Sequence, residues 1–162
     1  MKKIYNPFVD HSSKDYNCFG CSPNNSLGLQ LEFWDTGDEL VTRWNPKNWL
    51  VGYNSILHGG IQATLMDEIA GWVVLVKCKT AGVTTEINVK YLKPVYITKG
   101  ELEVRARLEG MDEMIANISC RLFDGEGVCC ATANAKYFCY PERIARRKLY
   151  YPGVEAFYND PG

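Results

Sequence analysis

Two consecutive glycines, Gly59 and Gly60, follow His58 at the start of the strongest helical pattern in the chain. Each glycine costs a helix roughly 1 kcal/mol relative to alanine, so the pair needs a compensating reason. One reason is structural, because glycines allow a sharp turn into the helix or the close approach of a sheet. The other is chemical. A helix start without side chains lets a substrate oxygen reach free backbone N–H groups at the positive end of the helix dipole, as an oxyanion hole does.

Asp67 is the second candidate for chemistry. It lies seven residues after Gly60, which in a helix places it within about 20° of the same face and about 10 Å further along the axis. The helix dipole favours a carboxylate mainly in the first turn, so the dipole does not account for this position. A buried, unpaired carboxylate would be costly. Two interpretations stay open: a catalytic carboxylate, or one that is hydrogen-bonded or solvated at an oligomer surface.

Two neighbouring residues are candidates for supporting roles. Glu68 points about 100° away from Asp67, towards the apolar face that carries Trp72, which favours a structural role or a contact with substrate. His58 at the helix start is interpreted as a cap or positioning group rather than a base. A serine hydrolase is not favoured, because the chain has no GxSxG motif.

Seven cysteines form an odd number, which argues for reduced thiols. The segment Cys18-Phe19-Gly20-Cys21 is a lone CxxC pair. A structural zinc site usually needs two such pairs, and the other cysteines form none. A redox CxxC normally opens a helix, whereas this one runs into the turn signal Ser22-Pro23-Asn24-Asn25. We therefore expect neither a metal nor a redox centre.

These residues must be positioned by one long helix and an antiparallel sheet. The helical pattern covers about 59–78 and is apolar nearly all round in its second half, so it must be buried on more than one side. Several stretches alternate apolar and polar residues with period two, which indicates half-buried strands. The predicted strands are 29–34, 39–44, 83–91, 101–108, 115–123 and 128–138, with turns at 35–38, 111–113 and 124–127. In 83–91 the alternation sets Val83, Thr85, Ile87, Val89 and Tyr91 against Thr84, Glu86, Asn88 and Lys90. The fold class is α+β.

Length and charge limit the number of domains and the kinds of partner that the chain can have. A chain of 162 residues with 46% hydrophobic content suits one domain over 1–162, with 1–28 as an N-terminal segment and 140–162 as a tail packed on it. A net charge of −1 gives no broad positive field for nucleic acid or an anionic membrane. No signal peptide or membrane-spanning run is evident, so a cytoplasmic location is expected.

The motifs resemble a known family. Residues 54–68 contain His58-Gly59-Gly60 and Asp67 and resemble the HGG-x6-D segment of the hotdog-fold thioesterases of the phenylacetate-pathway (PaaI-like) type. Residues 82–94 resemble that family's next strand, and Cys18-Phe19-Gly20-Cys21 is similar to an N-terminal element of many bacterial members. The order of the motifs adds specificity that HGG alone would lack.

The resemblance implies a fold and a site. It implies a hotdog fold, in which a curved antiparallel sheet wraps around one long central helix, and homodimers, often paired into homotetramers, with active sites at the subunit interface. By this likeness Gly59 donates a backbone N–H to the thioester carbonyl, Asp67 of the partner subunit acts as nucleophile or general base, and Thr84 positions water. The family often has Asn six residues before the histidine, where this chain has Gly52. Asn54 is the candidate replacement.

The expected function is hydrolysis of an acyl-CoA to a carboxylic acid and coenzyme A. No cofactor is expected, since coenzyme A is part of the substrate. Lys90 and Lys93, with Glu68, are candidate substrate-binding residues, because lysines can meet the phosphates of coenzyme A. The alternative is a non-catalytic acyl-CoA binding or sensing module that uses the same pocket. A hotdog hydratase would instead need a histidine paired with an acid, such as His58 with Glu68.

Overall fold

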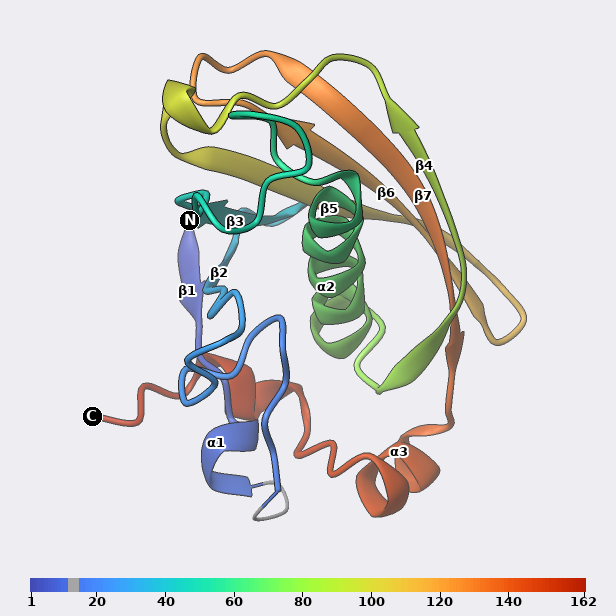
Figure 1. The fold of residues 1–162 in the computed structure, drawn as a ribbon. Coiled ribbons are helices and arrows are strands. Elements are labelled where there is room, and N and C mark those ends of the chain that lie inside the picture. The colour runs from blue at the N-terminus through green and yellow to red at the C-terminus, as the bar shows by residue number, and fades with distance from the viewer. Residues whose placement is uncertain (12–14) are drawn as a thin grey trace.

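A computed structural model describes residues 1–11 and 15–162. One long helix, α2 (Gly59–Lys77), is wrapped by a curved sheet of seven strands, all paired antiparallel (Figure 1). The predicted α+β hotdog arrangement is confirmed. In sheet order the strands are β1 (Lys2–Ile4), β2 (Phe33–Asp35), β3 (Leu40–Trp44), β5 (Leu102–Asp112), β6 (Ile115–Phe123), β7 (Cys129–Cys139) and β4 (Gly82–Tyr91).

Helix α2 forms the centre of the core. Leu65, Met66 and Ile69 have no exposed surface, and Trp72 and Val76 are nearly as buried. The helix contacts β5, β6, β7 and β4, so the sheet covers it on several sides. The predicted helix 59–78 is therefore confirmed to within one residue, and the all-round apolar pattern is explained by burial on more than one face.

Strands β5, β6 and β7 form two consecutive hairpins. In β5 the side chains of Leu102, Val104 and Ala106 are buried, as the alternation predicts. The β5–β6 turn falls at 113–114 because Asp112 still pairs with Ile115. The predicted turn at 111–113 was therefore placed slightly too early.

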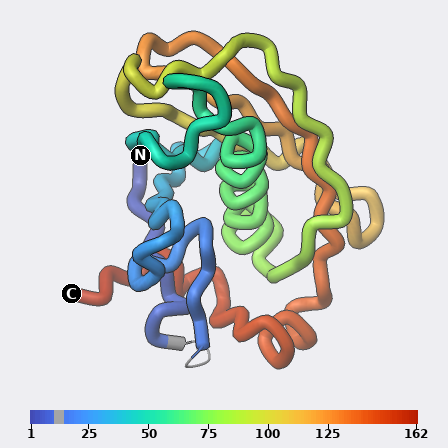
Figure 2. The backbone as a smooth tube through the Cα atoms, in the orientation of Figure 1, coloured from blue at the N-terminus to red at the C-terminus, as the bar shows by residue number. Residues whose placement is uncertain are grey.

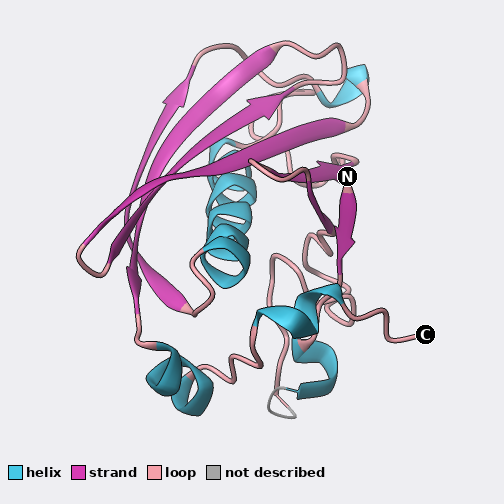
Figure 3. Ribbon diagram, turned by 180° about the vertical axis from the view of Figure 1, so that it is seen from behind, coloured by secondary structure: helices cyan, strands magenta, loops and turns pink. Residues whose placement is uncertain are grey.

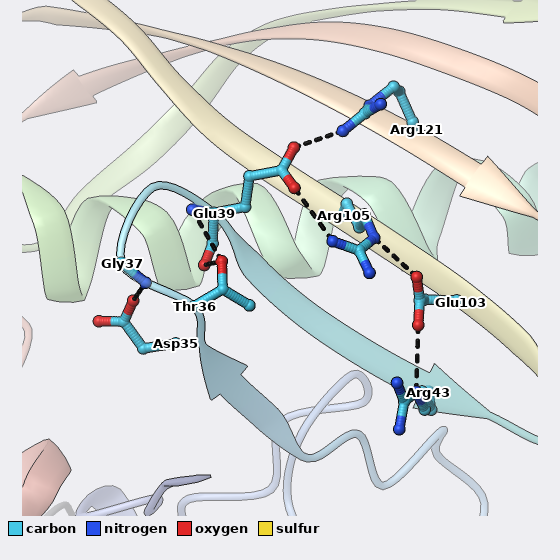
Figure 4. Close-up of polar contacts among 8 residues, drawn as sticks. All are labelled: Asp35, Thr36, Gly37, Glu39, Arg43, Glu103, Arg105 and Arg121. Carbon is cyan, nitrogen blue, oxygen red and sulfur yellow. Dashed lines mark hydrogen bonds and ion pairs between the residues drawn. The ribbon is translucent and has the colours of Figure 1, made fainter. Parts of the chain in front are cut away.

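The outer face of the sheet carries charged residues (Figure 4). Arg105 donates hydrogen bonds to Glu103 at 2.6 Å and to Glu39 at 3.2 Å, and Arg43 donates to Glu103 at 3.1 Å. Arg121 also pairs with Glu39. The network connects β3, β5 and β6 on the side away from α2 (Figure 4). Because this face is charged and the opposite face is apolar, the strands show a clear period-two pattern. Ion pairs near the surface each contribute little stability.

The predicted strand 29–34 is wrong over residues 29–32. The N–H groups of Leu29 and Leu31 donate to the carbonyls of Phe19 and Gly20, at 2.8 Å and 2.9 Å. They do so in place of pairing with β3, so β2 begins only at Phe33. Strand β1, which the sequence analysis did not predict, pairs with the other side of β2.

Strand β4 lies at one edge of the sheet and contains an irregularity. The pairing with β7 shifts between Thr84 and Glu86, which is the mark of a β-bulge. The simple alternation placed Thr84 and Tyr91 on opposite faces. That prediction is wrong, since both hydroxyls make hydrogen bonds to α2. The strand is also more exposed than predicted, with Val83 43% and Tyr91 52% exposed.

The two terminal segments meet at one end of α2 (Figure 2). They contain α1 (Phe8–His11), α3 (Glu142–Lys148) and a short 3-10 helix at Val154–Tyr158, whereas a second 3-10 helix, Ile97–Lys99, connects β4 to β5. The Tyr5 N–H donates to the Phe157 carbonyl at 2.8 Å, and the Tyr151 hydroxyl donates to the Leu75 carbonyl at 3.0 Å. Seen from behind, the sheet curves around α2 and these segments lie below its lower end (Figure 3). None of the described helices is long and apolar enough to cross a membrane.

Candidate active site

Asp67 lines a cleft of about 440 Å³ beside the middle of α2. The helix, β4, β7 and the N-terminal segment all contribute to its walls. Asp67 itself is half-buried. The lining residues include Tyr16, Cys18, Cys21, Glu68, Trp72, Val83, Thr84 and Tyr137.

One oxygen of the Asp67 carboxylate is held by two hydroxyls. Thr84 Oγ1 lies 2.9 Å and the Tyr137 hydroxyl 2.6 Å from Oδ1. Tyr137 is also 2.6 Å from the Asp67 carbonyl oxygen, so its one proton is shared between the two. Within residues 1–11 and 15–162, Oδ2 accepts no hydrogen bond and no cation pairs with the carboxylate. The carboxylate is thus oriented while one oxygen stays available.

Tyr137 is a site residue that the sequence analysis did not identify. Burial, together with the negative charge of Asp67, raises the pKa of the Tyr137 hydroxyl well above its usual value. The hydroxyl therefore stays protonated and acts as a donor to Asp67. The only signal in the sequence is that Tyr137 ends an inward-facing row of small residues (Ala131, Ala133, Ala135), where a large polar group stands out.

At the start of α2 the two glycines are not equivalent. The Gly60 N–H donates to His58 Nδ1 at 2.9 Å, so His58 is the helix cap. The Gly59 N–H has no acceptor among the residues that the structure describes. The Tyr91 hydroxyl donates to the Gly59 carbonyl at 2.6 Å and ties the next peptide, Gly59–Gly60, to β4. The helix start therefore offers the amide of Gly59 rather than two free amides.

The Gly59 amide and Asp67 do not meet within one chain. They are eight residues apart on α2, which corresponds to about 12 Å along the helix axis. A single carbonyl group cannot contact both at that distance. One site that uses both groups needs α2 of a second subunit.

A comparison with models of protein families covers the helix start and Asp67. The model described as "Thioesterase superfamily" matches residues 54–131, a range that contains the helix start, Asp67 and most of the sheet. These residues are similar to the thioesterase superfamily. The match ends before Tyr137 and begins after the CxxC pair.

Individual proteins are similar to this chain over most of its length. A protein of Saccharolobus solfataricus named "Putative esterase" is 29% identical over 127 residues, which are 77% of this chain and 82% of the relative. A protein from Streptococcus pneumoniae TIGR4 described as a hypothetical thioesterase, solved with coenzyme A, has a TM-score of 0.63 and 22% identity over 69% of this chain and 90% of that one. A Streptococcus mutans UA159 protein bound to acetyl CoA has a TM-score of 0.65 and 16% identity over 81% of this chain and 98% of that one.

The remaining predicted site residues lie apart from Asp67. Asn54 is exposed and makes no hydrogen bond with the described residues. Gly52, not Asn54, lies against the helix cap, since a Cβ on Gly52 would be 3.7 Å from His58 Cα. Lys90 and Lys93 are exposed and flank Tyr91, at the end of β4 that reaches the helix start.

Glu68 lies in the cleft beside Asp67. It accepts hydrogen bonds from Cys18 Sγ at 3.4 Å and Trp72 Nε1 at 3.3 Å. The contact with Trp72 agrees with the predicted direction of the side chain. Glu68 is ten residues from His58 on α2, or about 15 Å along the axis. The histidine and acid pair of a hydratase is therefore not formed within one chain.

Proposed function

We propose that the protein hydrolyses an acyl-CoA thioester to a free carboxylic acid and coenzyme A. The observation that carries the proposal is the state of Asp67. Its carboxylate lies in a cleft, is held on Oδ1 by Thr84 and Tyr137, and pairs with no cation in the part of the chain that the structure describes. A base or nucleophile needs this combination of a fixed orientation and one free oxygen.

The proposed chemistry uses groups from two subunits. The Gly59 N–H of one subunit donates to the thioester carbonyl, whose oxygen gains negative charge during attack, so the contact strengthens in the transition state. Asp67 of the partner subunit either removes a proton from the attacking water or attacks the carbonyl itself. In both cases the C–S bond breaks, coenzyme A leaves as the thiol after taking a proton, and water supplies the oxygen of the new acid.

A homodimer is part of this proposal, and a pair of dimers is its natural extension. Strand β4 is at the sheet edge, and one of its sides has no partner strand in the described chain. Its exposed residues include Val83, Tyr91 and the adjacent Leu92. An exposed, apolar strand edge favours pairing with another chain. Pairing there would bring a second α2 near the first.

Coenzyme A is the proposed carrier of the acyl group. Two similar structures hold coenzyme A or acetyl CoA. Lys90 and Lys93 are exposed near the helix start and are the proposed contacts for its phosphates. None of the seven cysteines forms a disulfide bond, which supports a reducing compartment such as the cytoplasm.

The decisive experiment measures release of free coenzyme A from a panel of acyl-CoA esters. The change Asp67→Asn keeps the shape of the side chain and removes the base or nucleophile. We expect turnover to fall by at least about a hundredfold, with substrate binding retained. Near-normal turnover in this variant would show that another group is catalytic. Tight binding by the wild type without release would favour an acyl-CoA binding module.

A matched pair of variants tests the Gly59 amide. His58 has φ −56° and ψ 133°, which suits a residue before proline, and proline is well tolerated at the first helical position. Gly59→Pro therefore removes the N–H while the helix keeps its backbone. Gly59→Ala adds a Cβ 3.3 Å from Tyr91 Cζ but keeps the N–H. We expect turnover to fall by two to three powers of ten in Gly59→Pro and far less in Gly59→Ala.

A further inference from the structure

Three potential metal ligands converge at the wall of the cleft. The sulfur atoms of Cys18 and Cys21 and a carboxylate oxygen of Glu68 all lie within 4.8 Å of one another. The two thiols come from the N-terminal segment and the carboxylate from α2. Cys18 Sγ lies 3.4 Å from Glu68 Oε1. The sequence showed only the two cysteines, because Glu68 is 47 residues beyond Cys21.

The backbone around the cysteines is shaped to support negative charge on sulfur. The Cys21 N–H points to Cys18 Sγ at 3.4 Å, and an N–H donor stabilises a thiolate. The loop itself is fixed, since the carbonyls of Phe19 and Gly20 accept the N–H groups of Leu29 and Leu31. A CxxC loop with a backbone N–H directed at the first sulfur can supply two of the four ligands of a zinc site.

Gly20 allows the carboxylate to reach the thiols. A Cβ at this position would lie 2.3 Å from Glu68 Cδ. Any larger residue would therefore push Glu68 away from the two sulfur atoms. The glycine inside the CxxC pair thus opens the space that the third ligand fills.

The surroundings suit a cation. Glu68 is half-buried, and among residues 1–11 and 15–162 its hydrogen bonds come from a thiol and an indole N–H, not from a charged group. The cleft is lined by two carboxylates and two thiols, and its lining contains no lysine, arginine or histidine within the described chain. Nothing in this lining balances the negative charge that these groups carry when ionised.

We propose that Cys18, Cys21 and Glu68 bind one zinc ion. Sulfur ligands favour zinc over magnesium or calcium, and tetrahedral zinc with Zn–S bonds of about 2.3 Å holds its ligands about 3.5 Å apart. The 3.4 Å contact of Cys18 with Glu68 is close to that spacing. Binding releases the two thiol protons. The fourth ligand position faces the cleft and is filled by water.

Bound zinc fastens the N-terminal segment to α2 next to Asp67. It stabilises the folded chain, because the metal binds the native arrangement of ligands. This role is separate from the proposed hydrolysis, so zinc content and turnover can fail independently.

The test uses the full chain, purified under reducing conditions, stripped with a chelator and then titrated with zinc chloride. Bound metal is measured by elemental analysis after desalting, and proton release is followed in weak buffer. Cobalt chloride is used in parallel, because a Co²⁺–thiolate bond gives a charge-transfer absorption band. The variants are Cys18→Ser, Cys21→Ser and Glu68→Gln. Cys129→Ser is the matched control, since Cys129 is a half-buried thiol outside the cluster.

We expect the wild type and Cys129→Ser to bind one zinc per chain with release of two protons, and each cluster variant to bind at least about tenfold more weakly. The number of protons released per zinc ion is measured on the wild type, so this test remains valid even if a cysteine variant fails to fold. No stoichiometric metal in the reduced wild type would overturn the proposal. A proton release near zero, or an equal loss of metal in the Cys129→Ser control, would also overturn it. The same holds if Cys18 and Cys21 only form a disulfide and the chain takes up no metal after that disulfide is reduced.

Discussion

At the scale of single residues, the candidate site depends on how Asp67 is held. Thr84 and Tyr137 both contact Oδ1, so neither blocks the oxygen that the proposed reaction needs. Tyr137 acts through Asp67 and is a positioning residue. Its hydroxyl also reaches the Asp67 carbonyl, which ties the side chain to the backbone of α2.

Tyr137→Phe removes one of the two donors to Asp67 and leaves Thr84 in place. A hydrogen bond to a charged group contributes about 1.5–3 kcal/mol, so we expect kcat to fall at least about tenfold. KM should change little, because Tyr137 is not proposed to bind substrate. Steady-state kinetics on one acyl-CoA ester separates the two constants, and the melting temperature serves as a check on folding. An equal kcat in variant and wild type would show that Tyr137 does not position Asp67 for the reaction.

Sequence reasoning reached some of these residues and not others, for physical reasons. Gly59 and Asp67 could be found because glycine pairs and mid-helix carboxylates are costly and therefore noticeable. Tyr137 could not, since a strand pattern gives the face on which a side chain lies but not what its hydroxyl reaches across the core. The free amide at Gly59 also required the structure, which shows that His58 occupies the amide of Gly60.

At the scale of elements, the helix and the central strands were predictable and the edges were not. Strands β5 and β6 alternate cleanly, because one face packs on α2 and the other carries the ion pairs of Arg105 and its neighbours. Strand β4 hides a bulge that shifts the alternation by one residue. The stretch 29–32 has strand-like composition, but it bonds to the CxxC loop instead.

Gly28→Ala tests the contact between that loop and the following chain. A Cβ on Gly28 would lie 2.3 Å from the backbone carbonyl oxygen of Phe19, which cannot move aside as a side chain could. We expect a loss of about 1–3 kcal/mol in the free energy of unfolding, measured by urea denaturation. Gly110→Ala is the control, because no atom lies within 4 Å of its added Cβ. A stability equal to that of the control would show that the loop is not tightly packed.

At the scale of the whole molecule, the proposed two-subunit site makes a prediction about mixed dimers. Gly59→Pro and Asp67→Asn each lack one half of every site. In a mixed dimer, one site combines the intact Gly59 of one subunit with the intact Asp67 of the other. Co-expression should therefore restore about a quarter of the wild-type activity, since random pairing gives about half mixed dimers with one good site of two.

The control for this experiment is each variant expressed alone, where we expect almost no release of coenzyme A. If co-expression restores nothing while both variants fold and assemble, the two groups do not act across an interface. That result would leave the Asp67→Asn test of hydrolysis intact.

A second whole-molecule prediction concerns pH. Asp35 accepts hydrogen bonds from Lys77 at 2.7 Å and 2.8 Å, from Tyr158 at 2.6 Å and from the Gly37 N–H at 2.7 Å. It thereby joins the β2–β3 turn, the end of α2 and the tail. Burial acts to raise the pKa of Asp35, but these donors outweigh it and hold the pKa below its usual value. The unfolded chain therefore binds the proton more readily than the folded one.

The stability from Asp35 is fully present above about pH 4, the pKa of an unfolded aspartate, and is lost as the pH falls through the folded pKa. We expect Asp35→Asn to be less stable than wild type at pH 7, because Lys77 loses its counter-charge. The difference should shrink as the pH falls below about 4. Urea unfolding at several pH values measures it, and a constant difference would contradict the linkage.

The bulge in β4 has a consequence for how this strand tolerates changes in length. Thr84 contacts the carboxylate in the middle of α2, and Tyr91 contacts the carbonyl at its first residue. Because side chains in a strand alternate between faces, one residue added or deleted between the two would turn one of these hydroxyls outward. Relatives that share both contacts should therefore keep this spacing, while the loop at 113–114 is free to grow.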